Sequence, residues 1–168
     1  MIKSAVIFGG GLKDSNTKEY LETIEIGKML SHNGYDIKSG GYYGIMEAVS
    51  KGCSEANGHS IGYTCKSFKT TKGNKYLSET IECDNIYNRL ENLIEGSDLF
   101  IVQRGSYGTL SELFLTLDIV RKMENKPTIL LIGGFWNDIF KSIFQLVNEN
   151  EVNLFTIIDD YKDIIKYV

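Results

Sequence analysis

Short apolar runs alternate with amphipathic stretches along the whole chain. The runs predict strands at residues 4–8, 35–38, 59–63, 79–83, 98–102, 127–132 and 154–158. Helices are expected from a cap at residue 16 or 17 to a stop at 33–34, and at residues 45–56, 85–96, 110–125, 135–148 and 161–167. This alternation is typical of a parallel sheet covered by helices on both faces. We therefore predict an α/β fold with a doubly wound, mostly parallel sheet. Because no linker, repeat or low-complexity segment interrupts the pattern, residues 1–168 are expected to form a single domain.

Composition and charge narrow the class of protein. The 168 residues are 42% hydrophobic and 24% charged, which excludes a disordered or fibrous chain. A net charge of -4 provides no broad basic field, which argues against nucleic-acid and membrane partners. No apolar run approaches the roughly 18 residues of a membrane span, and no signal-like series precedes Ile2. We expect the mature chain to begin here and to reside in the cytoplasm.

The sequence offers few ligands for a metal. Its three cysteines, Cys53, Cys65 and Cys83, are odd in number, and none lies in a Cys-x-x-Cys pair. The histidines are His32 and His59 alone. Neither a disulfide framework nor a zinc site is indicated, and no metal site is expected.

Glycine is abundant, with 17 residues against a single proline. Three glycine clusters follow three of the expected strands, at Gly9, Gly10 and Gly11, at Gly40, Gly41 and Gly44, and at Gly105 and Gly108. An open parallel sheet binds its ligand at the carboxyl ends of its strands, where free N–H groups at helix starts attract phosphate. One cluster alone is equally consistent with a tight turn. Three at equivalent positions indicate a phosphate-bearing ligand.

The helix expected at residues 110–125 carries a candidate carboxylate, Glu112, one turn from its start, and Thr109 is expected to cap or line that start. The plain alternative for Glu112 is a carboxylate that favours the helix dipole. The helix has two apolar sides, one formed by Leu110, Leu113, Phe114 and Leu117 and the other, on the side of Glu112, by Leu115, Ile119 and Met123. A helix with two apolar sides usually packs against other protein surfaces on both of them. We expect the sheet and a second subunit to cover it, with Glu112 near a sheltered pocket.

Arg89 is the second candidate. It lies at the margin of an expected buried stripe formed by Ile86, Leu90, Leu93 and Ile94. Arginine is seldom buried without a partner, so a carboxylate or a phosphate is expected beside it. The alternative is a surface arginine whose stem covers the apolar stripe.

Several of these segments together resemble the LOG (lonely guy) family, and they are also similar to molybdenum-cofactor carrier proteins. They are residues 39–49, Arg89 with Leu93, Ser97-Asp98 and residues 105–112, and the resemblance extends from the first strand to about Leu131. The family loop Pro-Gly-Gly-x-Gly-Thr-x-x-Glu matches from Arg104 to Glu112, with Arg104 replacing proline and Ser106 replacing the second glycine. The family motif Arg-Lys-x-x-Met keeps Arg89 but has Leu90 and Leu93 at the other two positions.

The resemblance implies a Rossmann-like fold, a homodimer and a phosphoribohydrolase. Its substrate would be a purine nucleoside 5'-monophosphate of the AMP or cytokinin-riboside type. Arg89 and Glu112 would be catalytic, and Met46 and Glu47 would lie near the base. For Met46 a plain core position is an equal alternative. The nucleotide-binding residues implied are Gly9, Gly10, Gly40, Gly41, Gly44, Arg104, Gly105, Ser106, Tyr107, Gly108 and Thr109. A nucleotide or molybdenum-cofactor carrier with little catalysis is the alternative.

No resident cofactor is expected. Some members of the family carry the label of a lysine decarboxylase. No lysine of this chain lies in a context that favours a Schiff base with pyridoxal phosphate. Arg104 would add a cation beside the phosphate, whereas Ser106 would place a side chain where the backbone is expected to approach the ligand.

Overall fold

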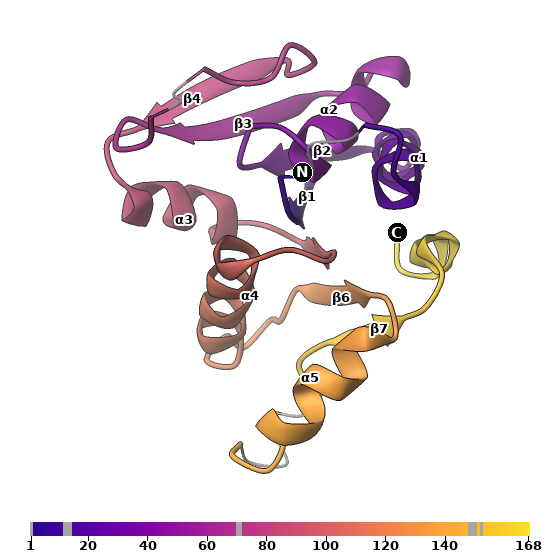
Figure 1. Cartoon of the computed structure of the whole chain (residues 1–168), viewed down its shortest axis with the longest axis vertical. Helices are drawn as coiled ribbons and strands as arrows, with labels where there is room; N and C mark the ends of the chain where they lie inside the picture. The colour runs from indigo at the N-terminus through magenta and orange to yellow at the C-terminus, as the bar shows by residue number, and fades with distance from the viewer. Residues whose placement is uncertain (1, 12–14, 70–71, 148–150, 152) are drawn as a thin grey trace.

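The computed structural model describes residues 2–11, 15–69, 72–147, 151 and 153–168. Within them, seven strands form one parallel sheet (Figure 1). The strands are β1 (Lys3–Phe8), β2 (Tyr35–Ser39), β3 (Ser60–Cys65), β4 (Glu79–Cys83), β5 (Leu99–Val102), β6 (Thr128–Ile132) and β7 (Thr156–Ile158). The helices are α1 (Lys18–His32), α2 (Ile45–Glu55), α3 (Ile86–Ile94), α4 (Tyr107–Val120) and α5 (Phe135–Ile143), followed by the 3₁₀ helix η1 (Tyr161–Lys166).

The strand order β4-β3-β2-β1-β5-β6-β7 reverses direction beside β1. The chain builds outward from β1 through β2 and β3 to β4, then returns to place β5 on the other side of β1. Ligands of open α/β sheets bind at this kind of switch point, outside the carboxyl ends of the strands. The predicted α/β, Rossmann-like architecture is confirmed, and every strand pairing is parallel.

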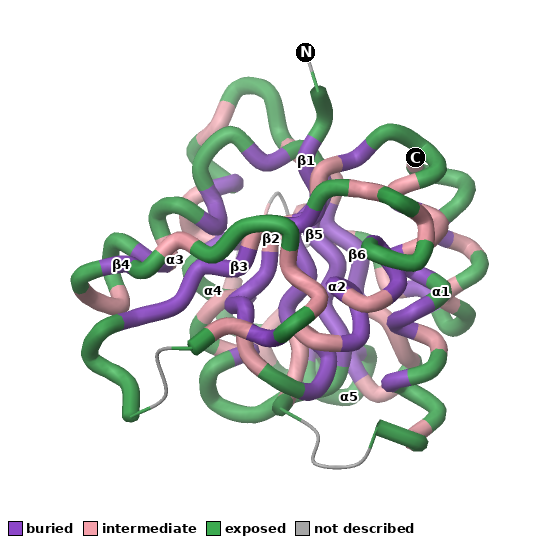
Figure 2. Tube along the Cα trace, turned by 90° about the horizontal axis from the view of Figure 1, so that it is seen from above, coloured by how far each residue is buried: buried purple, intermediate pink, exposed green. Residues whose placement is uncertain are grey.

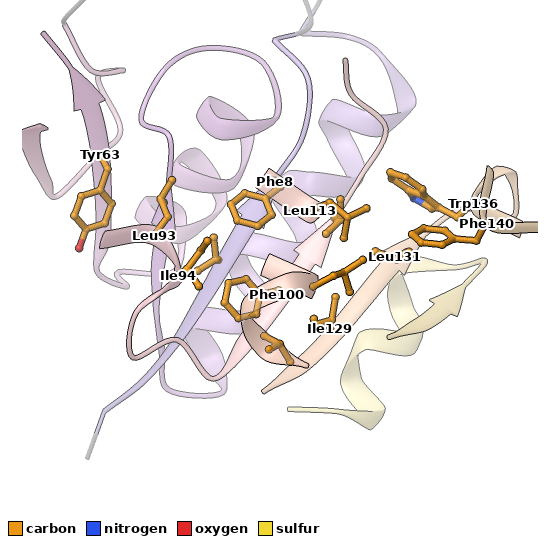
Figure 3. Close-up of a cluster of buried hydrophobic side chains, with 14 of the residues drawn as sticks. Phe8, Tyr63, Leu93, Ile94, Phe100, Leu113, Ile129, Leu131, Trp136 and Phe140 are labelled. Carbon is orange, nitrogen blue, oxygen red and sulfur yellow. The ribbon is translucent and has the colours of Figure 1, made fainter. Parts of the chain in front are cut away.

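Alternate residues of the central strands face two separate cores. Ala5 and Ile7 of β1 face α1, α2 and η1, whereas Val6 and Phe8 face α3, α4 and α5. Figure 3 shows part of the second core, where the Phe8 and Phe100 rings lie with their centroids 6.0 Å apart. Figure 2 shows that buried residues concentrate along the central strands. Burial on both faces explains why these strands are continuous apolar runs.

Helix α4 differs from its expected bounds. It begins at Tyr107, with Ser106 as the N-cap, so Thr109 lies inside the first turn rather than at the cap. It ends at Val120 because the N–H groups of Lys122 and Met123 donate to the carbonyls of Ile119 and Val120, in tighter turns than an α-helix makes. Phe114, expected on the sheet-facing stripe, is 40% exposed.

Other departures concern the last third of the chain. The segment expected as a final helix is a 3₁₀ helix, η1, and α5 ends at Ile143. Its expected end, Asn148, lies outside the described residues.

The longest helix, α1, has 15 residues, and no helix within the described ranges is long and apolar enough to cross a membrane.

Candidate functional site

A pocket of about 410 Å³ opens at the switch point, between the ends of β1 and β5. It brings together most of the residues singled out from the sequence, namely Gly9, Gly10, Gly11, Met46, Arg89, Ser106, Tyr107, Gly108, Thr109 and Glu112. It is also lined by Tyr42, Phe68, Ile86, Leu90 and Ser111. The volume lies within the range of small-molecule sites.

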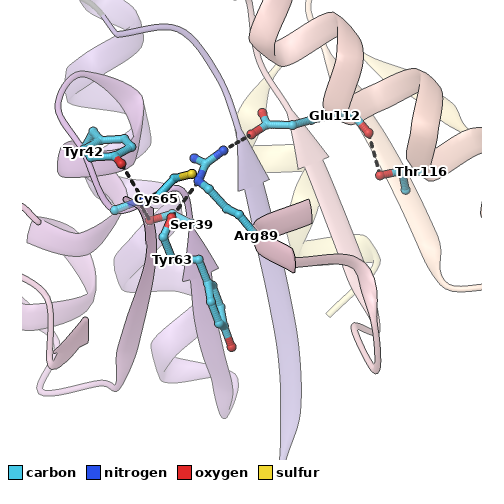
Figure 4. Close-up of polar contacts among 8 residues, drawn as sticks. Ser39, Tyr42, Tyr63, Cys65, Arg89, Glu112 and Thr116 are labelled. Atoms are coloured by element: carbon cyan, nitrogen blue, oxygen red, sulfur yellow. Dashed lines mark hydrogen bonds and ion pairs between the residues drawn. The ribbon is translucent and has the colours of Figure 1, made fainter. Parts of the chain in front are cut away.

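Arg89 of α3 and Glu112 of α4 meet in this pocket. The Nη1 atom of Arg89 lies 3.3 Å from Oε1 of Glu112, and both side chains are nearly buried (Figure 4). On the other side of the guanidinium, Nε donates a hydrogen bond of 2.7 Å to the backbone carbonyl of Tyr63 in β3. The expected carboxylate partner of Arg89 is therefore present. The alternative of a surface arginine is wrong, because Arg89 is only 5% exposed.

Aromatic rings and a glycine complete the surroundings of Arg89. The guanidinium carbon lies 5.7 Å from the ring centre of Tyr42 and 5.8 Å from that of Phe68. A Cβ atom at Gly40 would overlap Nη2 of Arg89 and lie 2.7 Å from the sulfur of Met46. Gly40 is not among the residues that line the pocket. Its lack of a side chain makes room for the arginine.

The carboxyl of Glu112 has an unusual protonation equilibrium. Burial raises the pKa of Glu112 from its ordinary value of 4.5 to about 7, and the Arg89 guanidinium, which lowers it, offsets only part of this effect. Desolvation disfavours the charged carboxylate more than one arginine at 3.3 Å favours it. A carboxyl that titrates near neutral pH can accept a proton during a reaction.

Close packing defines the loop that follows β5. The Gly10 N–H donates to the Arg104 carbonyl at 3.1 Å, which ties the loops after β1 and β5 together. A Cβ atom at Gly105 would overlap Oγ1 of Thr109, so this glycine lets the loop close onto the first turn of α4. Ser106 caps α4 without a side-chain hydrogen bond, and the first turn contains no acidic residue. The start of α4 therefore offers N–H groups and a positive dipole to an anion.

The remaining candidates lie around the pocket rather than in it. Gly41 and Gly44 have positive φ values of 77° and 70° and shape the turn between β2 and α2. The Arg104 guanidinium lies 4.7 Å from the ring centre of Phe135. Arg104 and Gly105 are not among the residues that line the pocket.

Two aromatic residues of the pocket were not singled out from the sequence. Tyr42 lies inside the second glycine cluster, and Phe68 is the aromatic residue of the lysine-rich segment 66–75, of which residues 70 and 71 lie outside the described ranges. Asn74 anchors this segment, because its side-chain amide donates to the carbonyls of Gly41 and Tyr42. In the sequence, the one feature that could have pointed to Phe68 is that it is an aromatic residue within a long polar loop.

The comparisons with known proteins identify the family. The family model for SLOG cluster4 matches residues 3–160. The chain belongs to the SLOG cluster4 family. Among the relatives of this SLOG protein, the probable cytokinin riboside 5'-monophosphate phosphoribohydrolase LOGL3 of Oryza sativa subsp. japonica is 27% identical over 158 residues, 90% of this chain and 74% of the relative. The cytokinin riboside 5'-monophosphate phosphoribohydrolase LOG5 of Arabidopsis thaliana is 31% identical over 117 residues, 67% of this chain and 51% of the relative.

Solved structures similar to this SLOG protein support the same fold. The molybdenum cofactor binding protein from Rippkaea orientalis has a TM-score of 0.79 at 22% identity, and the match covers 99% of this chain and 96% of that one. The molybdenum cofactor carrier protein of Chlamydomonas reinhardtii has a TM-score of 0.77 at 20% identity, covering 98% and 95%. The resemblance to the LOG family and to these carriers is confirmed. At this identity the structural matches establish the fold alone.

Replacing Gly40 tests how the SLOG protein accommodates Arg89. Gly40→Ala is expected to displace the guanidinium and to lower the free energy of unfolding by about 1–3 kcal/mol, as overpacking does. Gly108→Ala is the matched control, because nothing lies within 4 Å of its added Cβ. Urea denaturation of both variants measures the difference. Equal stability of Gly40→Ala and the wild type would show that Arg89 does not need this space.

A pH-dependent stability measurement tests the protonation of Glu112. Between about pH 4.5 and 7 the folded protein keeps a proton that the unfolded chain has lost. The contribution of Glu112 to the free energy of unfolding therefore falls as pH rises through this window. Glu112→Gln cannot ionise, so its stability relative to the wild type should be greater at pH 8 than at pH 5, by about 1–3 kcal/mol. Thermal unfolding at both pH values measures this change, with exposed Glu124→Gln as the control. A difference that is the same at both pH values would contradict the raised pKa.

Proposed function

We propose that this protein is a phosphoribohydrolase that cleaves the N-glycosidic bond of a purine nucleoside 5'-monophosphate. Free base and ribose 5-phosphate are the products. The buried pair of Arg89 and Glu112, 3.3 Å apart and facing the start of α4 in one pocket, is the observation that carries this proposal. The printed names of the plant relatives favour the AMP or cytokinin-riboside type of substrate. The chain spans between half and three quarters of the length of those two relatives, so their activity applies to this chain as a proposal.

The 5'-phosphate binds at the start of α4 in this proposal. Ser106, Tyr107, Gly108 and Thr109 line the pocket there, and helix N-termini attract phosphate through their free N–H groups and their dipole. The added Cβ of an alanine at Gly108 would meet no atom within 4 Å, so the glycine leaves open space beside the loop. The ribose then lies toward Glu112, which is one turn further along α4.

Cleavage needs stabilisation of positive charge and a proton acceptor. When the bond from C1' to the base nitrogen breaks, its electron pair goes to the base and the ribose becomes oxocarbenium-like. The ionised carboxylate of Glu112 stabilises this charge and accepts a proton from the water that attacks C1'. A proton from solvent restores the neutral base. Arg89 positions the carboxylate and favours its ionised form.

A nucleotide or molybdenum-cofactor carrier with little catalysis is the second candidate function. Such a carrier would use the same pocket, and the loop departures at Arg104 and Ser106 would act on how the ligand is held. The titles of the structural neighbours name molybdenum cofactor binding and carrier proteins. Both candidate functions need a phosphate-bearing ligand in the same pocket, and they differ in whether product forms.

A homodimer is also part of the proposal. A groove of about 470 Å³ between α3 and α4 is lined by Tyr87, Leu90, Glu91, Ile94, Glu95, Leu115, Ile119 and Met123. Leu115 is 37% exposed there, so the second apolar side of α4 is open in the protomer. Leu90 lines both this groove and the candidate active site. A second copy covering the groove would shelter the pocket as well.

Substitution of Glu112 separates the two functions. If the protein is a hydrolase, Glu112→Ala is expected to slow release of free base from AMP or an N6-substituted AMP by about a hundred- to ten-thousandfold, because the stabilising carboxylate is lost. Chromatography of the reaction measures the base. Binding without any product in the wild type, unchanged by Glu112→Ala, would favour the carrier. A melting temperature that no nucleotide changes would contradict both functions.

Sedimentation tests the dimer. Leu115→Glu places a charge in the groove and is expected to convert a dimer to a monomer at micromolar concentration. Leu21→Glu is the control, because Leu21 is an exposed leucine of α1 on the opposite side of the sheet. A wild-type protein that sediments as a monomer would refute the dimer.

A further inference from the structure

Lys38 is a charged residue on an apolar face of the sheet. In β2 it is in register with Val6 of β1 and with Ile61 of β3, and both of these pack in the core that faces α3, α4 and α5. Side chains of in-register residues in a parallel sheet point to the same face. Moving an ammonium group out of water costs free energy unless the group is paired. Lys38 therefore needs specific partners at this position.

The end of α3 provides these partners. The Lys38 ammonium donates hydrogen bonds to the carbonyls of Asn92 at 3.2 Å and Glu95 at 2.9 Å. It also donates to the hydroxyl of Ser97 at 3.1 Å, and this hydroxyl donates in turn to the Leu93 carbonyl. The last carbonyls of a helix lack donors within the helix, and α3 has no basic residue in its last turn. Lys38 thus supplies, from β2, the cation that stabilises this helix end.

The ammonium is bound to one place on the sheet face. It has three N–H groups, and each has an acceptor at the end of α3. Burial lowers the pKa of Lys38, whereas the carboxylates of Asp98 and Glu95 act in the opposite direction. Any shift of the helix end away from β2 would leave donors of a half-buried cation without acceptors, which is costly.

The anchored end of α3 lies close to Arg89. Arg89 precedes Asn92 by less than one helical turn, or about 4.5 Å along the axis. With nine residues, α3 is shorter than the roughly 12–15 residues that an isolated helix needs in water, so its placement depends on contacts with other elements. Two positions after Lys38, Gly40 makes room for Nη2 of Arg89. Residues 38–40 therefore hold the end of α3 and accommodate the guanidinium that α3 carries.

We propose that Lys38 is a positioning residue of the candidate site: by holding the end of α3 against β2, it keeps the Arg89 guanidinium beside Glu112. The distance of 3.3 Å between Nη1 and Oε1 is long for a hydrogen bond between charged groups, so a small shift of α3 breaks this contact. Lys38 is not among the residues that line the pocket, and it acts through Arg89. Its effect on turnover rests on the proposed phosphoribohydrolase function, whereas its effect on the position of Arg89 does not.

Three variants separate the hydrogen bonds of Lys38 from its packing. Lys38→Met keeps an unbranched apolar stem on the sheet face and removes all three donors. Lys38→Arg keeps a cation with several donors. Lys28→Met is the matched control, because Lys28 of α1 pairs with Glu25 at 2.8 Å and with Glu55 at 3.0 Å on the opposite face of the sheet.

Carbon NMR of the glutamate carboxyl groups measures the titration of Glu112, whose signal is identified by its absence in Glu112→Gln. Arg89 lowers the pKa of Glu112, so withdrawal of the guanidinium raises it. Lys38→Met is expected to raise the titration midpoint by at least about 0.5 pH units. Lys38→Arg and Lys28→Met should leave it unchanged. An unchanged midpoint in Lys38→Met would overturn the proposal even if the melting temperature falls, because a merely structural lysine stabilises the fold without placing Arg89.

Ser97→Ala decides the question if Lys38→Met does not fold. It removes one of the three acceptors of the ammonium and leaves the two carbonyls in place. The midpoint of Glu112 should move in the same direction as in Lys38→Met but less far. A midpoint equal to that of the wild type would then overturn the proposal.

Kinetics with AMP or an N6-substituted AMP provide the second readout. Lys38→Met is expected to lower kcat at pH 7 by about tenfold or more and to change KM by less than about threefold, because a misplaced group acts on the chemical step. The rising limb of the pH profile of kcat should move to higher pH, and Lys38→Arg should restore most of the rate. A change in KM alone would contradict the positioning role. If the wild type releases no base, the phosphoribohydrolase proposal fails, and the NMR titration still tests the role of Lys38.

Discussion

The burial of the Arg89 guanidinium constrains the rest of the site. Removing a cation from water costs free energy that other interactions must offset. Each neighbour of the guanidinium contributes to this offset. The Tyr63 carbonyl accepts from Nε, Glu112 approaches Nη1, and two aromatic rings lie within 6 Å of the guanidinium carbon. Gly40 leaves the necessary space. These groups come from β3, α4 and the loops after β2 and β3, so placing one arginine fixes the relative positions of elements on both sides of β1.

The same burial determines the chemistry of Glu112. Arg89 is a single partner at 3.3 Å, and it does not fully offset the desolvation of the carboxylate, so the pKa of Glu112 rises to about 7. Near neutral pH the carboxyl therefore exists in both protonation states. Under the proposed function, positive charge that develops on the ribose would favour the ionised state, so the carboxylate interacts more strongly with the transition state than with the bound substrate. This is the kind of differential binding that accelerates a reaction.

Much of this architecture could be predicted from the sequence because its signals are local. Apolar runs and amphipathic periods identified all seven strands, and two of the glycine clusters contribute residues to the pocket at the edge of the sheet. The role of Gly40 could not be predicted from its neighbours in the sequence. Gly40 makes room for a side chain 49 positions later in the chain. Likewise the burial of Arg89 depends on Tyr63 and Tyr42, which no periodicity within α3 reveals. Contacts between elements decide these roles.

The two departures from the family loop, Arg104 and Ser106, do not lie at the centre of the pocket. Arg104, in place of proline, lies with its guanidinium over the Phe135 ring and does not line the pocket. Ser106, in place of glycine, caps α4 at the edge of the pocket. Arg89 and Glu112, at its centre, are retained. A change at the edge acts on how a phosphate is held, whereas the charge that an N-glycosidic cleavage needs is supplied at the centre. The two loop substitutions are therefore expected to affect ligand affinity more than the chemical step, and by themselves they do not argue that catalysis is lost.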